Sequence, residues 1–193
     1  MRDPAKLTDR ENWTGGYYEL ALELDGRDDV RLRSVAETLW RVARVEGETS
    51  FDGFAHGEHS RGVVTLPSGA RSVTRLYASR SLEDADEGER GPDWVCMGLP
   101  LGALERLDRR IGSFPFGDDG VETSLVWQTG LDEWLAGVAR EVAAVWPFRL
   151  AVIGFEAVGG VSRDDLERHG LPEERPFALL VVGSTPGWFP ATN

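Results

Sequence analysis

Residues 17–45 read YYELALELDGRDDVRLRSVAETLWRVARV, and this stretch decides the fold class. Tyrosine and leucine alternate with glutamate over 17–25, which is the period-two pattern of a strand with one buried face. Asp28 and Asp29 are suited to cap a helix. Apolar residues then recur every three or four positions as far as about Val45, and Gly47 follows. The stretch therefore predicts a half-buried strand followed directly by an amphipathic helix.

The next elements continue this alternation of short strands and helices. Residues 62–66 and 71–77 read as two strands joined by Pro67-Ser68-Gly69, whose residue types favour a tight turn. Polar, glycine-containing segments at 46–60 and 80–92 predict loops. Residues 93–97 predict a short apolar strand. Leucines spaced three apart over 101–107 predict a short helix.

The C-terminal part contains the clearest helix pattern of the chain, from about Leu131 to Trp146, and Pro147 follows it. The residues expected on its apolar face are Leu131, Trp134, Leu135, Val138, Val142, Val145 and Trp146. Strands are predicted at 123–127, 148–158 and 177–182. A short capped helix is predicted at 162–169, and the residues after 182 read as a turn-rich tail.

This order predicts an α+β fold: a mixed, mostly antiparallel sheet with helices packed on one face. We expect one domain, 1–193, in which 17–79 and 121–183 form two strand–helix–strand–strand halves side by side. That arrangement resembles the architecture of small-molecule effector-binding domains of the gyrase-inhibitor-like type. The resemblance concerns element order alone and implies a ligand cleft between the halves.

Charge restricts the classes of partner. Lys and Arg number 21 and Asp and Glu 33, which gives a net charge of −12. Such a surface repels nucleic acids and anionic membranes, so neither is expected as a partner. It suits a basic protein partner, and a cationic or neutral small molecule equally well. Nothing in the sequence specifies an oligomeric state.

Several features favour a cytoplasmic location. Cys96 is the single cysteine, so no intrachain disulfide can form. The polar start of the chain is unlike a signal peptide. The longest apolar run, 177–182, is far shorter than the roughly 20 residues of a membrane span. Cys96 lies between Val95 and Met97, so a buried structural thiol is expected.

The common cofactor and catalytic motifs are missing from the sequence. It contains no Gly-x-Gly, and Lys6 is its only lysine, which excludes the dinucleotide fingerprint and the phosphate-binding loop with its lysine. Neither Cys-x-x-Cys nor His-Glu-x-x-His occurs. We therefore expect no cofactor and no bound metal.

One candidate site is the loop that contains Asp52, His56, Glu58 and His59. Imidazoles three residues apart could share a ligand or a metal if the backbone turned helically. The glycines within this loop and the lack of a third, distant ligand favour a flexible polar loop instead.

The second candidate is Glu156, which lies inside the apolar strand predicted at 148–158. A carboxylate there would be partly desolvated, with a raised pKa, and could bind a cation or transfer a proton in a cleft between the halves. The alternative is that the strand frays before Gly159-Gly160 and Glu156 reaches water. Trp13 and Trp188, beside glycines near the termini, could line a pocket or simply pack.

These observations leave two hypotheses about function. The preferred one is an acidic binding or regulatory protein without catalytic activity, comparable to an immunity-type protein, which holds a basic partner or a small ligand. The alternative is an enzyme or effector-binding domain with an unfamiliar site near Glu156 or the His56/His59 loop. A deep pocket at these residues would favour the second hypothesis, and a flat acidic face the first.

Overall fold

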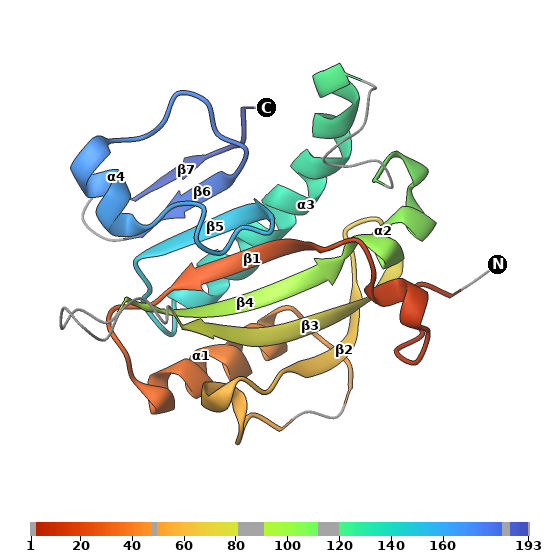
Figure 1. Cartoon of the computed structure of the whole chain (residues 1–193), viewed down its shortest axis with the longest axis horizontal. Helices are drawn as coiled ribbons and strands as arrows, with labels where there is room; N and C mark the ends of the chain where they lie inside the picture. Colours follow the sequence, from red (N-terminus) through yellow and green to blue (C-terminus); the bar gives the residue numbers. More distant parts are fainter. Residues whose placement is uncertain (1–2, 48–49, 81–90, 112–119, 183–185, 193) are drawn as a thin grey trace.

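A computed structural model describes residues 3–47, 50–80, 91–111, 120–182 and 186–192. Its centre is a seven-stranded sheet in the order β2-β3-β4-β1-β5-β6-β7, and every neighbouring pair is antiparallel (Figure 1). The strands are β1 (Tyr17–Glu23), β2 (Ser60–Thr65), β3 (Arg71–Arg80), β4 (Asp93–Pro100), β5 (Leu150–Phe155), β6 (Ala178–Val181) and β7 (Gly187–Phe189).

The α-helices are α1 (Asp29–Val42), α2 (Leu101–Leu107), α3 (Gly120–Ala143) and α4 (Arg163–His169). Three short 3-10 helices accompany them: η1 (Arg10–Trp13), η2 (Phe54–His56) and η3 (Arg109–Ile111). The α+β class and the antiparallel sheet are confirmed. No helix of the described ranges is long and apolar enough to cross a membrane.

Strand β1 lies at the centre of the sheet because both of its edges are paired. Leu20 is in register with Met97 of β4 on one side and with Ile153 of β5 on the other. The hairpin of β2 and β3 closes through the expected turn, where the Leu66 N–H donates to the Ala70 carbonyl at 2.8 Å. Gly69 has φ +79°, a backbone conformation that glycine adopts without steric cost.

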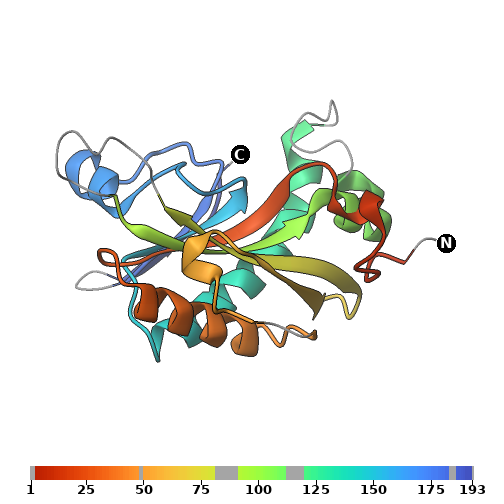
Figure 2. The same cartoon turned by 60° about the horizontal axis from the view of Figure 1, so that its bottom comes forward.

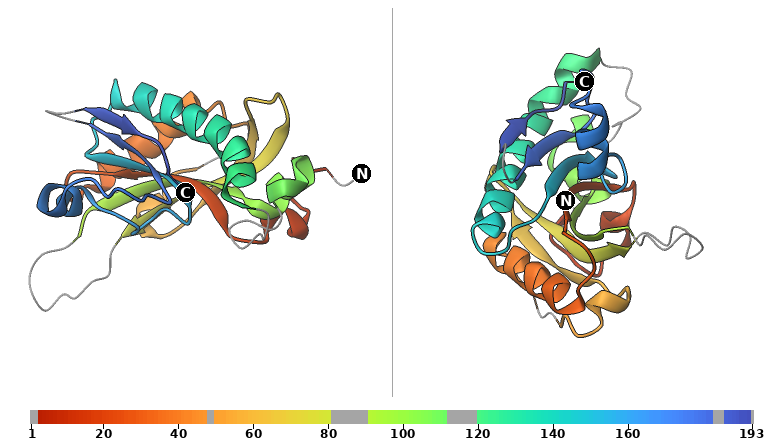
Figure 3. Two further views of the ribbon diagram at one scale, coloured as in Figure 1. Left: turned by 90° about the horizontal axis from the view of Figure 1, so that it is seen from above. Right: turned by 90° about the vertical axis from the view of Figure 1, so that its left-hand side faces the viewer.

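The two faces of the sheet are covered by different helices. Helices α1 and α3 pack side by side on one face, whereas α4 lies on the other (Figures 2 and 3). The larger core lies under α1 and α3 and contains Leu20, Leu39 and Leu135. A smaller cluster lies under α4 and contains Ala21, Cys96 and Val152. Helices are therefore concentrated on one face, with one short helix as the exception.

The strand predicted at 123–127 is wrong, because these residues belong to α3. Five apolar-rich residues are too few for periodicity to separate a strand from a helix. The helix also ends earlier than expected, at Ala143, and Val145 beyond it is 55% exposed. The C-terminal part thus begins with a helix and does not repeat the strand–helix–strand–strand order of the first part.

The C-terminal tail contains an element that the sequence pattern did not indicate. Strand β7 pairs with β6 through Leu180 and Trp188 and completes the edge of the sheet. Helix α4 is capped as predicted: the Ser162 side chain accepts from the Asp165 N–H, and the Asp165 side chain accepts from the Ser162 N–H.

A polar contact joins the two layers inside the larger core. The buried Tyr18 of β1 donates its hydroxyl proton to Asp132 Oδ1 of α3 at 2.5 Å. The Tyr18 ring also packs edge-on against Trp127, with centroids 5.2 Å apart. Burial raises the pKa of Asp132 from 3.8 to about 6. Ionisation of Asp132 in the folded protein therefore lowers the free energy of unfolding.

The packing of α3 can be tested at two positions of its expected apolar face. Leu135 is completely buried, so Leu135→Ala is expected to lower the free energy of unfolding by about 2–5 kcal/mol. Val145→Ala is the control, and it should change stability by less than about 0.5 kcal/mol. Urea denaturation measures both, and equal effects at the two positions would contradict the orientation of the helix.

The cost of ionising Asp132 predicts a pH dependence of stability. Since its pKa is higher in the folded protein than in the unfolded chain, its stabilising contribution is present below pH 4 and is lost as the pH rises through about 6. Asp132→Asn cannot titrate. Its stability relative to the natural protein should rise by about 2 kcal/mol between pH 4 and pH 7. Glu37→Gln, on the exposed side of α1, is the control, and parallel pH curves for Asp132→Asn and the natural protein would refute the assignment.

Candidate functional site

The sheet face opposite α1 and α3 carries a row of polar and small residues. Arg61 of β2, Arg75 of β3, Gly98 of β4, Glu19 of β1 and Gly154 of β5 are in register across five strands. Paired residues of neighbouring strands point to the same face. Helix α4 packs over the β5 and β6 part of this face, through Leu166. The part formed by β1 to β4 therefore holds the candidate site.

The guanidinium of Arg75 packs over two tyrosine rings. Its guanidinium carbon lies 3.6 Å from the ring centroid of Tyr17 and 4.5 Å from that of Tyr77. Gly98 makes room for this arrangement, because a Cβ at that position would lie 3.0 Å from Tyr17 Cδ1. Arg75 is half-buried, its Nε atom is buried without a hydrogen bond, and no ion pair to it is found among the described residues.

A buried carboxylate, that of Glu19, is hydrogen-bonded to one of these two tyrosines. Glu19 is 2% exposed and accepts a 2.5 Å hydrogen bond from the Tyr77 hydroxyl and another from the Ala157 N–H. Burial raises the pKa of Glu19, although Tyr77 and Arg75 act in the opposite direction. Burial likewise raises the pKa of the neighbouring Cys96 thiol, and this fully buried residue is structural, as the sequence predicted.

A second arginine–aromatic pair lies beside the first. The Arg61 guanidinium lies 4.8 Å from the ring centroid of Trp13, whose indole N–H donates to the Leu7 carbonyl at 2.9 Å. Arg61 Nε also donates to His59 Nε2 at 3.1 Å. Partial burial, followed by the charges of Arg61 and Arg75, lowers the pKa of His59. We call Trp13, Tyr17, Arg61, Arg75 and Tyr77 the arginine–aromatic cluster.

The structure places the residues of the predicted histidine loop in different surroundings. His59 adjoins the arginine–aromatic cluster, whereas Asp52 faces α1, where its carboxylate lies 3.8 Å from Arg33. His56 closes η2, and both it and Glu58 are exposed. No group of three His, Cys, Asp or Glu residues that could hold a metal ion occurs in the described part of the chain.

Glu156 is not the desolvated carboxylate that its strand pattern predicted. Strand β5 ends at Phe155, so Glu156 lies just beyond the strand and its side chain is not held on either face of the sheet. The Glu156 side chain is exposed. Its backbone has φ +44° and its N–H donates to the Tyr17 carbonyl at 2.9 Å. The alternative prediction, that this strand frays and Glu156 reaches water, is confirmed. Its charge still acts on the cluster, because it raises the pKa of Glu19.

Sequence reasoning missed most of the arginine–aromatic cluster, although it noted Trp13. One signal was present: Arg75 and Tyr77 are two residues apart in a predicted strand and hence on one face. The partners Tyr17 and Glu19 are more than fifty positions away along the chain. Only strand order and register bring them together.

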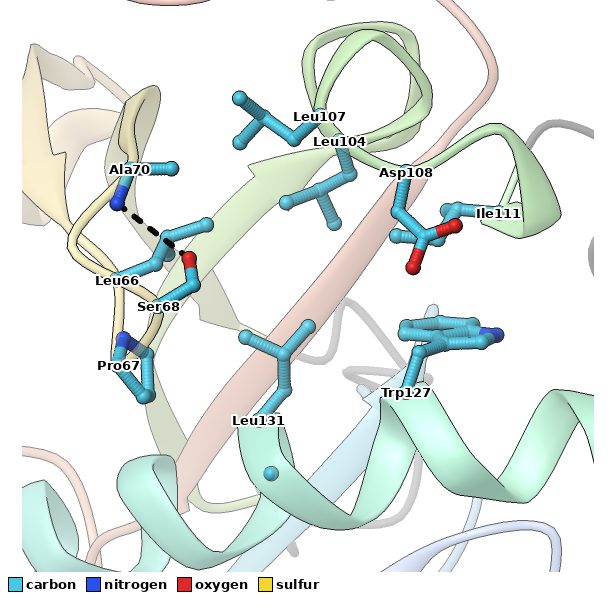
Figure 4. Close-up of a pocket in the computed structure, with 11 residues that line it drawn as sticks. Leu66, Pro67, Ser68, Ala70, Leu104, Leu107, Asp108, Ile111, Trp127 and Leu131 are labelled. Atoms are coloured by element: carbon cyan, nitrogen blue, oxygen red, sulfur yellow. Dashed lines mark hydrogen bonds between the residues drawn. The ribbon is translucent and has the colours of Figure 1, made fainter.

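An apolar cavity of about 400 Å³ lies on the other side of the molecule (Figure 4). The turn after β2, helix α2 and helix α3 enclose it, and the side chains of Leu66, Leu104 and Leu131 point into it. Asp108 and the indole of Trp127 form one end of the cavity. Its lining offers apolar contact rather than an arrangement of catalytic groups.

The comparisons with known proteins gave no match. No family model matches this chain, and no curated protein or solved structure is significantly similar to it.

The hydrogen bond between Tyr77 and Glu19 can be tested with a matched pair of variants. Tyr77→Phe leaves the buried Glu19 without its phenol donor and should lower the free energy of unfolding by about 1–3 kcal/mol. Tyr17→Phe is the control, since no hydrogen bond from the Tyr17 hydroxyl is found in the described ranges and its ring still covers Arg75. Urea denaturation at pH 7 gives both values, and equal losses would contradict the special role of Tyr77.

Proposed function

We propose that this protein is a non-catalytic binding protein that holds a protein partner against the arginine–aromatic cluster. The observation that carries the proposal is Arg75, whose guanidinium packs on the rings of Tyr17 and Tyr77. The residue is half-buried and forms no ion pair among the described residues. An arginine held in this way presents its N–H groups to a carboxylate with little further loss of side-chain freedom.

The composition of the cluster supports a protein partner. Tryptophan, tyrosine and arginine are the residue types that contribute most binding energy in protein interfaces. The cluster lies on strands β1 to β3 and η1, and other residues line the four pockets found beside the helices of the described residues. A sheet surface that lines none of these pockets suits a protein better than a small molecule, which is usually bound in a concave pocket.

Charge determines which partner fits. The net charge of −12 attracts a basic protein over long range and increases its rate of association. Within this acidic molecule Arg61 and Arg75 are in register on neighbouring strands and bring two positive charges together, beside the buried Glu19 and near the exposed Glu156. The proposed partner is therefore basic overall and inserts a carboxylate side chain between or beside these two arginines.

The proposal is tested by affinity purification from the source cells followed by reconstitution with the purified partner. The natural protein and Arg41→Ala, an exposed change on α1, should retain one and the same basic protein. Arg75→Ala should raise the dissociation constant of that complex by about 30-fold or more. Arg75→Lys should also weaken it, because an ammonium lacks the planar stacking of a guanidinium.

The ionic strength provides a second measurement on the purified complex. Association should slow as salt is increased from 50 to 500 mM, because charge steering is screened. Arg75→Ala should act mainly on the dissociation rate. A complex that is formed equally well by Arg75→Ala would show that the partner binds elsewhere, and a purified partner that is acidic overall would contradict the charge argument.

A further inference from the structure

A second site lies between α3 and the C-terminal segment, on the face of the sheet opposite the arginine–aromatic cluster. It is a cavity of about 250 Å³, lined by Gln128, Asp132 and Glu133 of α3 and by Trp188 of β7, among others. Trp188 lies on the same face as the larger core, since it pairs with Leu180. The cavity is small, so it suits a chemical group of a few atoms rather than a drug-sized ligand.

Asp132 is a buried carboxylate that lines this cavity. Its residue is 5% exposed, and only Oδ1 is hydrogen-bonded, to the Tyr18 hydroxyl. No hydrogen bond to Oδ2 is found among the described residues, and this oxygen is not one of the fully buried atoms without a partner, so it is accessible. A mostly buried carboxylate with one hydrogen bond is only partly compensated for the hydration it loses on folding, and a bound cation would stabilise its ionised form.

Trp188 supplies an aromatic wall. An indole ring is the best aromatic partner for an ammonium or guanidinium group. This ring already associates with the Arg140 guanidinium, which lies 5.7 Å from the ring centroid. Arg140 is exposed and forms no ion pair with Asp132 in the described ranges, so the carboxylate is not neutralised from within α3.

We propose that this cavity binds the ammonium or guanidinium group of a small organic cation between Asp132 and Trp188. The exposed carboxylate of Glu133 adds negative charge at the cavity, and the buried amide of Gln128 can accept a hydrogen bond from the same group. This site is independent of the partner surface on the opposite face, and either proposal can fail without the other.

The charged and titratable groups around Asp132 give binding a defined pH dependence. They are Tyr18 of β1, Glu133 of the same helix, and Arg140 near Trp188. The cation needs the ionised carboxylate, and the pKa of Asp132 is about 6 in the free protein. Affinity should therefore rise from pH 5 to pH 7, by about tenfold, because only about a tenth of the carboxyl groups are ionised one pH unit below the pKa.

The first experiment titrates the full chain with methylguanidinium, and the shift of the Trp188 indole N–H signal in NMR spectra reports binding. N-methylurea, which is neutral and nearly the same shape, is the matched control ligand. We expect saturable binding of methylguanidinium at pH 7, binding about tenfold weaker at pH 5, and none of N-methylurea. Equal binding of the two compounds, or no saturable binding of methylguanidinium, overturns the proposal.

Two variants assign the effect to the cavity. Asp132→Asn preserves the volume and can still accept from Tyr18, so it should fold, lose at least tenfold in affinity and lose the pH dependence. Glu37→Gln removes the same charge from the exposed side of α1 and should bind like the natural protein. Trp188→Leu lacks the reporting indole, so its affinity is measured by isothermal titration calorimetry, as is that of the natural protein for comparison. This variant should bind several-fold more weakly, and it gives the answer if Asp132→Asn fails to fold. Unchanged affinity in either cavity variant overturns the proposal.

Discussion

The alternation of side chains along β1 is the constraint on which both faces of this protein depend. Because successive residues of a strand point to opposite sides, Tyr18 and Leu20 lie under α1 and α3, while Tyr17 and Glu19 lie on the other face. Strand β1 is central and paired on both edges, so its register cannot slip without moving every one of these residues to the wrong side. The contact of Tyr18 with Asp132 and the stacking of Tyr17 on Arg75 both follow from this one strand.

Glu19 and Asp132 are buried carboxylates on opposite faces of the sheet, and they are satisfied differently. Glu19 receives hydrogen bonds from Tyr77 and from a backbone N–H and lies near the positive Arg75. Asp132 receives a single hydrogen bond and borders a cavity. Burial raises the pKa of both, which is a sign of functional sites when it coincides with an unfilled space or an exposed charged group.

Several arginines of this acidic protein each form ion pairs with two carboxylates. Arg80 pairs with Asp29 and Asp93, and Arg149 pairs with Glu23 and Asp164. Arg106 likewise joins α2 to the segment that contains η1. Arg75 departs from this pattern, because its guanidinium packs on two aromatic rings and, although Glu19 lies nearby, forms no ion pair with a carboxylate of the described residues. Its local environment is the reason that we assign recognition to it and structural roles to the paired arginines.

The sequence by itself determined the elements whose signals are local. The period of β1, the apolar face of α1, the turn at 67–69 and the cap of α4 depend on neighbouring residues and were predicted. Only the tertiary structure decided that 123–127 is helical, that Glu156 reaches water, and that Arg75 meets Tyr17. These outcomes depend on where an element ends and on strand register between segments far apart in the chain. Both are set by packing across the whole sheet, which leaves no periodic trace in any single stretch of sequence.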